Sequence, residues 1–275
     1  MTLPNADAEK ARWTASADLW DRWADPMAEL ADKLNQPLLD AAGVRPGAVV
    51  LDLASGAGEP ALSAARRAGT EGFVLGTDLV PAMLSGAVRR AAAAEPRPAF
   101  AAADMTALPF RTGAFDAVTC RFGIMFVPDA AGALAEVRRV LKPGGRAAFM
   151  VWGPRAENAL FAAVGGAVED RLGPDPVHGI GPLFRYAETG SLAAALTEAG
   201  FAEAAETALT PVRKAPRGQP FWRATLDMLF GARIAGLDAG ERAALEADVV
   251  ARFDALAQGD LVPLPAHVRI GVGAA

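Results

Sequence analysis

The residues best suited to chemistry lie in a glycine-containing segment. Asp52 precedes Gly56 and Gly58, and the segment follows a short apolar run at residues 49–53. Such a run is typical of a buried parallel strand, and open α/β sheets bind ligands at the carboxyl ends of these strands. Glycines let a ligand approach the backbone closely because they carry no Cβ. A carboxylate at Asp52 would repel a pyrophosphate but would tolerate or favour an ammonium group.

Two more carboxylates follow the next two expected strands. Asp78 comes twenty residues after Gly58, at the position from which a carboxylate accepts hydrogen bonds from both ribose hydroxyls. Met83, in the following helix, can pack on an adenine face. Asp104 follows the third strand, where an ionised carboxylate suits the exocyclic amine of adenine. Three acidic residues at three successive strand ends predict a nucleoside ligand with a cationic or zwitterionic tail.

Structural interpretations of the same residues stay open. The segment around Asp52 can be a fold-forming turn with a helix cap, and Asp104 can cap the turn at Thr106. Cys120 lies in an expected strand, where a cysteine is more often a small core residue than a nucleophile. The three N-terminal tryptophans can form the core of a helix pair. They are Trp13, Trp20 and Trp23.

Strands and helices alternate around these candidate residues. This order favours an α/β, Rossmann-like, doubly wound and mostly parallel sheet. The chain up to Gly43 reads as helices, with Leu30, Leu34 and Leu38 at helical spacing. The expected strands of the core are 49–53, 72–77, 99–102, 115–121 and 146–152, and its expected helices are 61–68, 81–94 and 130–141.

Beyond Gly153 the alternation loosens. We expect one domain in three parts: a helical lid (1–43), a cofactor-binding core (44–153), and a substrate cap with the final strands (154–275). The segments 173–186 and 214–258 are the candidate cap elements. The expected elements of this part are helices at 157–171, 191–199, 220–234 and 240–258 and strands at 201–212 and 267–272.

Composition narrows the class of function. The net charge is −5 and no run of basic residues is present, so nucleic acid is not the expected partner. One cysteine and two histidines predict no disulfide and no metal site, as in a reducing compartment. No signal peptide is seen, and the longest apolar stretch, 159–168, is too short to cross a membrane. We expect a cytoplasmic protein with a small-molecule substrate; a homodimer stays open.

Five segments, 50–58, 76–78, 103–110, 115–118 and 138–145, together resemble class I S-adenosylmethionine-dependent methyltransferases. The likeness is greatest to the group around the ubiquinone and menaquinone C-methyltransferases. It implies S-adenosylmethionine as methyl donor, a seven-stranded sheet with an antiparallel final strand, and an aromatic residue, Trp20, that closes over the cofactor. The cofactor-binding residues expected from pattern and resemblance are Trp20, Asp52, Ala54, Gly56, Gly58, Asp78, Leu79, Met83, Asp104, Met105 and Arg121.

The chain departs from this group after the fourth strand. Met125 and Phe126 stand where the quinone methyltransferases have an arginine-asparagine pair. The resemblance therefore does not imply that the methyl acceptor is a quinone precursor. Apolar side chains here predict a hydrophobic or aromatic acceptor. Arg185 could orient it or could pair with Glu188 on the surface. The candidate substrate residues are Phe122, Met125, Phe126, Arg185 and Tyr186.

Methyl transfer from a sulfonium is an in-line displacement that needs alignment more than acid-base machinery. His178, in a proline-glycine segment, is the candidate general base, and a surface histidine is the alternative.

Two other functions stay open. One is a protein that binds S-adenosylmethionine without transferring methyl. The other is a nicotinamide-dependent oxidoreductase, against which the carboxylate before the glycine loop and the single nucleotide-binding half both argue.

Overall fold

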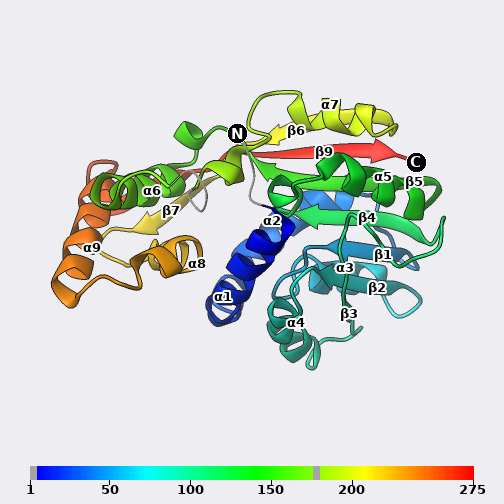
Figure 1. The fold of residues 1–275 in the computed structure, drawn as a ribbon, viewed down its shortest axis with the longest axis horizontal. Helices are drawn as coiled ribbons and strands as arrows, with labels where there is room; N and C mark the ends of the chain where they lie inside the picture. The colour runs from blue at the N-terminus through cyan, green and yellow to red at the C-terminus, as the bar shows by residue number, and fades with distance from the viewer. Residues whose placement is uncertain (1–4, 176–179) are drawn as a thin grey trace.

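The computed structural model describes residues 5–175 and 180–275. At its centre is a seven-stranded sheet with the order β3-β2-β1-β4-β5-β9-β6 (Figure 1). The first five strands run parallel, and β9 is antiparallel to both of its neighbours, as the resemblance implies. The strands are β1 (Val49–Leu53), β2 (Phe73–Asp78), β3 (Ala99–Ala102), β4 (Phe115–Arg121), β5 (Leu141–Trp152), β6 (Ala202–Leu209) and β9 (Val268–Ala274).

Each face of the sheet has its own apolar core, because successive side chains of a strand point to opposite faces. Val50 packs with Leu38 and Leu39, whereas its neighbours Leu51 and Leu53 belong to the core on the other face. Apolar residues on both faces explain why the strands read as continuous hydrophobic runs. The predicted doubly wound fold is confirmed. Its covering helices are α2 (Ala28–Ala41), α3 (Ala61–Ala68), α4 (Leu84–Ala91), α5 (Ala130–Val140) and α7 (Ser191–Glu198).

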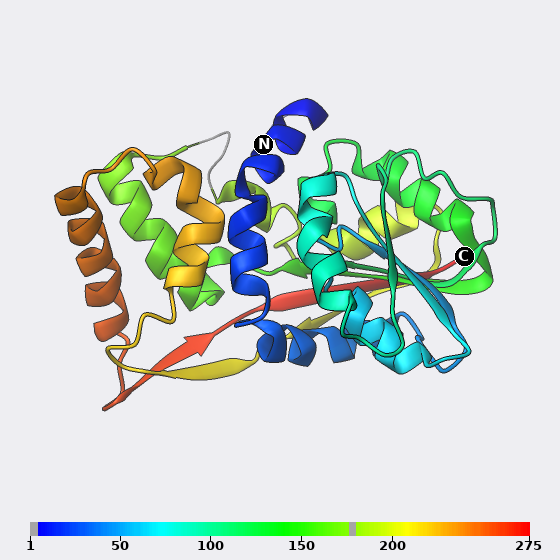
Figure 2. The same cartoon turned by 90° about the horizontal axis from the view of Figure 1, so that it is seen from below.

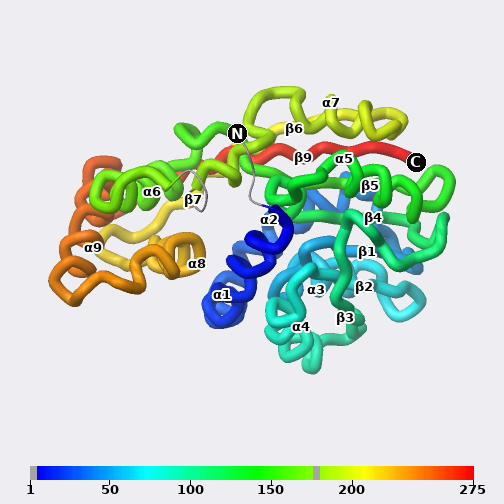
Figure 3. The backbone as a smooth tube through the Cα atoms, in the orientation of Figure 1, coloured from blue at the N-terminus to red at the C-terminus, as the bar shows by residue number. Residues whose placement is uncertain are grey.

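A second group of elements lies beside the main sheet. It contains the two-stranded antiparallel sheet β7–β8 and three helices, and Figure 2 shows α1 (Ala6–Ala24) between this group and α4. The tube in Figure 3 follows β9 from this group back along the main sheet to the end of the chain. The elements of the group are β7 (Val212–Pro216), β8 (Leu261–Pro265), α6 (Ala159–Leu172), α8 (Arg223–Ile234) and α9 (Ala239–Asp254).

The expected strand 201–212 was wrong in its extent. β6 ends at Leu209 and β7 begins at Val212 in the other sheet, because Pro211 has no N–H to continue the ladder. Strand β8 was not expected from the sequence. It contains Pro263 and Pro265, which argue against a strand but are tolerated in a two-stranded sheet.

The N-terminal helix pair matches the prediction. Asn5 caps α1, since its Oδ1 accepts a hydrogen bond of 2.9 Å from the N–H of Ala8. Helix α1 packs against α4 and α8, and α2 packs against α3 and β5. Among the described residues no helix is long and apolar enough to cross a membrane.

Candidate active site

A cavity of about 440 Å³ lies at the carboxyl ends of β1, β2, β3 and β4. Helix α1 forms a further wall, and α8 contributes Thr225, Met228 and Leu229. This is the edge of the sheet where open α/β folds bind ligands. The residues that sequence reasoning proposed and that line the cavity are Trp20, Ala54, Gly56, Asp78, Leu79, Met83, Asp104, Met105, Arg121, Phe122, Met125 and Phe126.

The loop after β1 approaches the loop after β4 very closely. Ala54 and Phe122 both have positive φ, at 52° and 59°, which L-residues seldom adopt. A Cβ on Gly123 would lie 2.5 Å from the Cβ of Ala54, so only glycine fits there. Backbone strain of this kind collects at functional sites. The two loops together form one wall of the cavity.

Gly58 does not line the cavity. It has φ +104°, and a Cβ there would lie 3.1 Å from the Leu62 side chain and 3.3 Å from the backbone of Ala87. Its small size therefore lets the glycine loop pack against α4. The structure supports a packing role for Gly58, where the sequence suggested ligand contact.

Asp52 lies beneath the glycine loop and is fully buried. Its Oδ2 accepts hydrogen bonds from Ser55 Oγ (2.7 Å) and the N–H of Ala61 (3.2 Å), and its Oδ1 accepts one from Thr119 Oγ1 (2.8 Å). Burial raises the pKa of this carboxyl to about 7, against the opposing effect of these hydrogen bonds. Asp52 therefore orders the loop from below, in place of the direct ligand contact expected from the sequence.

The raised pKa of Asp52 gives a pH dependence of stability that an amide lacks. Between pH ~4 and pH 7 the folded state binds more protons at this residue than the unfolded state, so the free energy of unfolding falls as pH rises. The slope is at most about 1.4 kcal/mol per pH unit. We expect Asp52→Asn to gain stability relative to the wild type over this range, with no further gain above it. Urea denaturation from pH 4.5 to 8 measures this, with Asp7→Asn as a surface control. Parallel curves for Asp52→Asn and wild type would show that Asp52 stays ionised.

Asp78 connects the ends of β1 and β2 at the cavity wall. Its Oδ2 accepts a hydrogen bond of 3.0 Å from the N–H of Gly56, and its Oδ1 accepts one of 3.0 Å from the N–H of Val80. Burial raises the pKa of Asp78, and the backbone donors oppose that shift. Each carboxylate oxygen can accept a second hydrogen bond, so both remain able to bind a ligand.

Asp104 combines the two roles considered for it. Its Oδ1 accepts hydrogen bonds from the N–H of Thr106 (2.8 Å) and from Thr106 Oγ1 (2.7 Å), so it does cap the turn. Asp104 also lines the cavity. Because both of these hydrogen bonds use Oδ1, Oδ2 is the oxygen suited to a ligand.

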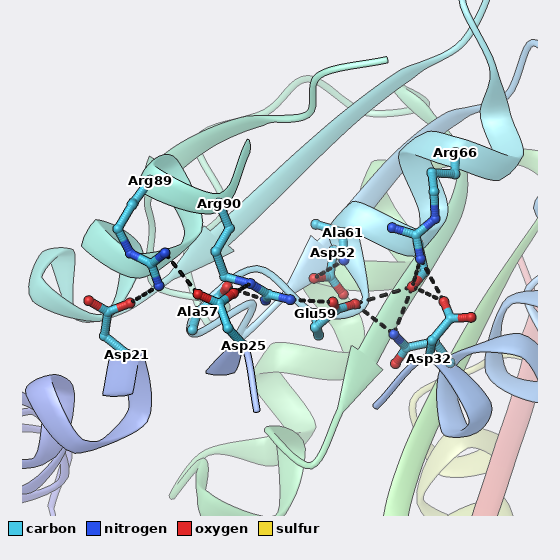
Figure 4. Close-up of polar contacts among 12 residues, drawn as sticks. Asp21, Asp25, Asp32, Asp52, Ala57, Glu59, Ala61, Arg66, Arg89 and Arg90 are labelled. Carbon is cyan, nitrogen blue, oxygen red and sulfur yellow. Dashed lines mark hydrogen bonds and ion pairs between the residues drawn. The ribbon is translucent and has the colours of Figure 1, made fainter. Parts of the chain in front are cut away.

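Ion pairs fasten the N-terminal helices to the glycine loop (Figure 4). Arg90 of α4 donates to the carbonyl oxygen of Ala57 (2.8 Å) and pairs with Glu59 (2.9 Å) in the loop and with Asp25 (2.9 Å) after α1. Arg89 pairs with Asp21 and Asp25. Helix α2 joins the same network, because Asn35 donates to Glu59 (2.7 Å) and Asp32 accepts from Ser63 Oγ (2.6 Å). The network holds α1 and α2 against the loop that lines the cavity.

Aromatic side chains surround the remaining part of the cavity. The rings of Trp13 and Phe126 meet edge to face with centroids 4.9 Å apart, and Phe122 stacks on Trp152 at 4.1 Å. Phe161 of α6 meets the Trp152 ring edge to face, with centroids 4.6 Å apart. These contacts make an apolar, aromatic surface.

Sequence reasoning missed several lining residues. Trp13 and Trp23 were weighed only as core, and Glu9 and the residues of α8 were not considered. One indication was available: Ala6, Glu9, Trp13 and Trp20 recur at helical spacing, so they share one face of α1. A face that mixes tryptophans with an acid could have suggested a ligand wall.

Two other candidates lie elsewhere. Arg185 donates a hydrogen bond to the carbonyl oxygen of Val127, and so supports the wall from behind instead of pairing with Glu188. The buried Tyr186 is not among the lining residues, and Arg185 stacks over its ring. His178 lies outside the described residues. Within residues 5–175 and 180–275, no group of three or more metal-ligating side chains is found.

The charge of the cavity wall is mainly negative. Among the described residues, five carboxylates line the cavity with two guanidinium groups, those of Arg90 and Arg121. Such a wall repels a pyrophosphate and favours a ligand that carries positive charge. Burial lowers the pKa of the Arg121 guanidinium, and the carboxylates of Glu59 and Asp52 oppose this effect. The lining carboxylates are Glu9, Glu59, Asp78, Asp104 and Asp129.

Four lining residues carry buried polar atoms without hydrogen-bond partners among the residues described. Three of these atoms are donors: Trp20 Nε1, Trp23 Nε1 and Arg121 Nε. The fourth is the acceptor Glu9 Oε1. Buried polar groups are normally paired, so a polar ligand suits this wall. Donors beside carboxylates match a ligand with a zwitterionic tail, as in S-adenosylmethionine.

Known proteins resemble the part of the chain that carries this loop. The methyltransferase domain family matches residues 50–145. A 2-phytyl-1,4-naphtoquinone methyltransferase of Trichormus variabilis is 42% identical over 110 residues, which cover 39% of this chain and 48% of that protein. A demethylmenaquinone methyltransferase of Thermus thermophilus is 46% identical over 112 residues, 40% of this chain and 50% of that protein. The chain thus matches about half the length of these relatives.

The fold is also found among solved structures. The YcgJ protein of Bacillus subtilis superposes with a TM-score of 0.56 at 20% identity, over 90% of this chain and 98% of that protein. At this identity the likeness establishes the fold alone. Together with the matched domain, it confirms that the chain resembles the class I S-adenosylmethionine-dependent methyltransferases around the quinone C-methyltransferases.

Proposed function

We propose that the chain transfers the methyl group of S-adenosylmethionine to a small hydrophobic or aromatic acceptor. The observation that carries the proposal is the cavity wall, which is acidic and holds unpaired buried donors next to a glycine loop. A nicotinamide dinucleotide would bring two phosphates to this wall, which makes the oxidoreductase the weaker alternative. The matched methyltransferase domain supports the same choice.

Each end of the cofactor has suitable partners in the cavity. Asp78 would accept hydrogen bonds from the ribose hydroxyls, and Asp104 Oδ2 would accept one from the exocyclic amine of adenine. Arg121 Nε would donate to the carboxylate of the methionine tail. The bound cofactor supplies an electrophilic methyl group on a sulfonium. The chain's own residues orient it and exclude water from it.

The aromatic part of the cavity supports a planar, apolar acceptor. Met125 and Phe126 are buried and apolar, and Trp13 and Trp152 present further ring surfaces. One relative named above is a 2-phytyl-1,4-naphtoquinone methyltransferase, and a naphthoquinone ring system is planar and apolar. A two-ring acceptor of this shape is our proposal for this chain. Its base is proposed to be either His178, expected from the sequence, or a carboxylate of the cavity wall. We also propose that the chain has the three parts described above, a lid, a core and a cap. We further propose that the protein can form a homodimer and that nucleic acid is not its substrate.

Release of S-adenosylhomocysteine tests the proposed function. We expect the protein to convert S-adenosylmethionine to S-adenosylhomocysteine only when an aromatic acceptor is present, with equal amounts of methylated product. A panel of 1,4-dihydroxynaphthalene, 2-naphthol and 2-naphthylamine, followed by mass spectrometry, detects both products. Tight binding of the cofactor without product from any acceptor would favour a protein that binds it and does not transfer methyl. Binding of NAD instead would contradict the proposal.

A further inference from the structure

Glu9 is the carboxylate that helix α1 contributes to the cavity, and it is only 3% exposed. Its Oε2 accepts a hydrogen bond of 3.0 Å from Trp13 Nε1 and lies 3.6 Å from Arg12 Nη1. Its Oε1 is buried and has no hydrogen-bond partner among the described residues. Burying a carboxylate oxygen without a hydrogen-bond donor costs free energy. A ligand that donates a hydrogen bond to Oε1 removes this cost and is bound more tightly.

The position of Glu9 separates it from the residues proposed for the nucleoside. Trp20 packs against the small cluster of Ala17, Val80 and Met83, beside the end of β2 that carries Asp78. Glu9 precedes Trp20 by eleven residues of continuous helix, which is about 16 Å along the axis. Trp13 lies between them and meets the ring of Phe126. Glu9 is therefore at the aromatic part of the cavity, not at its nucleoside part.

The neighbouring groups suit a ring that carries a polar hydrogen. The Arg12 guanidinium lies over the rings of Trp13 and Phe126, at 4.9 and 5.4 Å from their centroids, and its Nη1 is 3.6 Å from Glu9 Oε2. The cation, the carboxylate and the two rings therefore form one cluster. Burial lowers the pKa of Arg12, and Glu9 and Asp175 oppose this shift. An aromatic ligand stacked here would bring a substituent toward the carboxylate.

We propose that Glu9 Oε1 accepts the hydrogen bond of the acceptor's hydroxyl or N–H group. This inference rests on the proposed function and defines its substrate class as an aromatic molecule with such a donor. During transfer the acceptor's oxygen or nitrogen forms a bond to the methyl carbon while the carbon–sulfur bond breaks. The acceptor's O–H or N–H bond breaks with it, and the proton passes to Glu9.

Two compounds of similar shape test the inference. 2-Naphthol carries a hydroxyl where 2-methylnaphthalene carries a methyl group, and equilibrium dialysis measures the affinity of each, with and without S-adenosylhomocysteine. We expect the wild type to prefer 2-naphthol by about 10- to 100-fold, as a hydrogen bond to a charged group would give. In Glu9→Gln, which can still accept from Trp13, we expect the preference to fall at least fivefold. Asp7→Asn makes the same charge change on an exposed residue of α1 and should leave the preference unchanged.

Each outcome of this experiment supports or contradicts the role of Glu9. Equal affinity of the wild type for the two compounds would overturn the inference without any variant. An unchanged preference in Glu9→Gln would overturn it too, as would a large loss of S-adenosylhomocysteine affinity in that variant, which would assign Glu9 to the cofactor. If the wild type binds no S-adenosylhomocysteine, the proposed function fails, while the dialysis without it still tests Glu9 alone.

Discussion

Replacing Asp78 with alanine is expected to weaken the binding of S-adenosylmethionine by about 10²- to 10⁴-fold. Two ribose hydroxyls would each lose a hydrogen bond to a charged group, and such bonds contribute roughly 1.5–3 kcal/mol apiece. The variant also removes the oxygen that accepts the N–H of Gly56, so the glycine loop loses an anchor at the same time. Both effects act in the same direction.

Calorimetric titration with S-adenosylhomocysteine measures the loss for Asp78→Ala. Asp129→Asn is the matched control, because it removes a negative charge from the same cavity wall at the residue that caps α5. We expect the control to stay within about threefold of the wild type. Unchanged affinity in Asp78→Ala would contradict the ribose site, and an equal loss in the control would mean that net charge, not contact, governs binding.

Replacing Arg90 with methionine is expected to lower the free energy of unfolding by about 3–5 kcal/mol, since it leaves a buried carboxylate without its cation. Arg90 and Glu59 each expose only 8% of their side chains. Arg90 also donates to the carbonyl oxygen of Ala57, so the loop backbone loses a partner too. Methionine preserves much of the packing of the stem, which makes the lost charge the main difference.

Arg89→Met provides the comparison, because the adjacent arginine makes ion pairs with its side chain half exposed. Exposed pairs contribute about 0–1 kcal/mol, so the control should stay close to the wild type in urea denaturation. Adding Glu59→Gln to Arg90→Met should recover part of the loss. Similar losses in Arg89→Met and Arg90→Met would mean that burial of the Arg90–Glu59 pair has little influence.

The core of the fold could be predicted because its signals are local. Buried parallel strands give apolar runs such as residues 49–53, and the turns between them are marked by glycine and proline. β8 could not be found this way, since Pro263 and Pro265 suppress the usual strand pattern and its partner strand β7 lies far away in the sequence. Which strand pairs with which is decided by contacts far apart in the sequence.

The candidate site was predictable where one motif places one side chain. Asp78 ends β2 and Asp104 follows β3, and strand ends meet at one edge of a parallel sheet. Asp52 also follows this rule, yet the loop folds over it, and its spacing alone does not indicate whether it lies above or below the loop. Glu9 was missed for a related reason: an acid on an amphipathic helix usually faces solvent, and the sequence of α1 alone does not show that neighbouring elements bury Glu9.

Helix α1 carries Trp20 at the part of the cavity proposed for the nucleoside and Glu9 at its aromatic part, on one continuous helix. A ligand that fixes the position of one end of this helix also fixes the position of the other end, where the second ligand binds. The two binding equilibria are then thermodynamically linked, and linkage requires reciprocity. Whatever factor the cofactor adds to the affinity for the acceptor, the acceptor must add to the affinity for the cofactor.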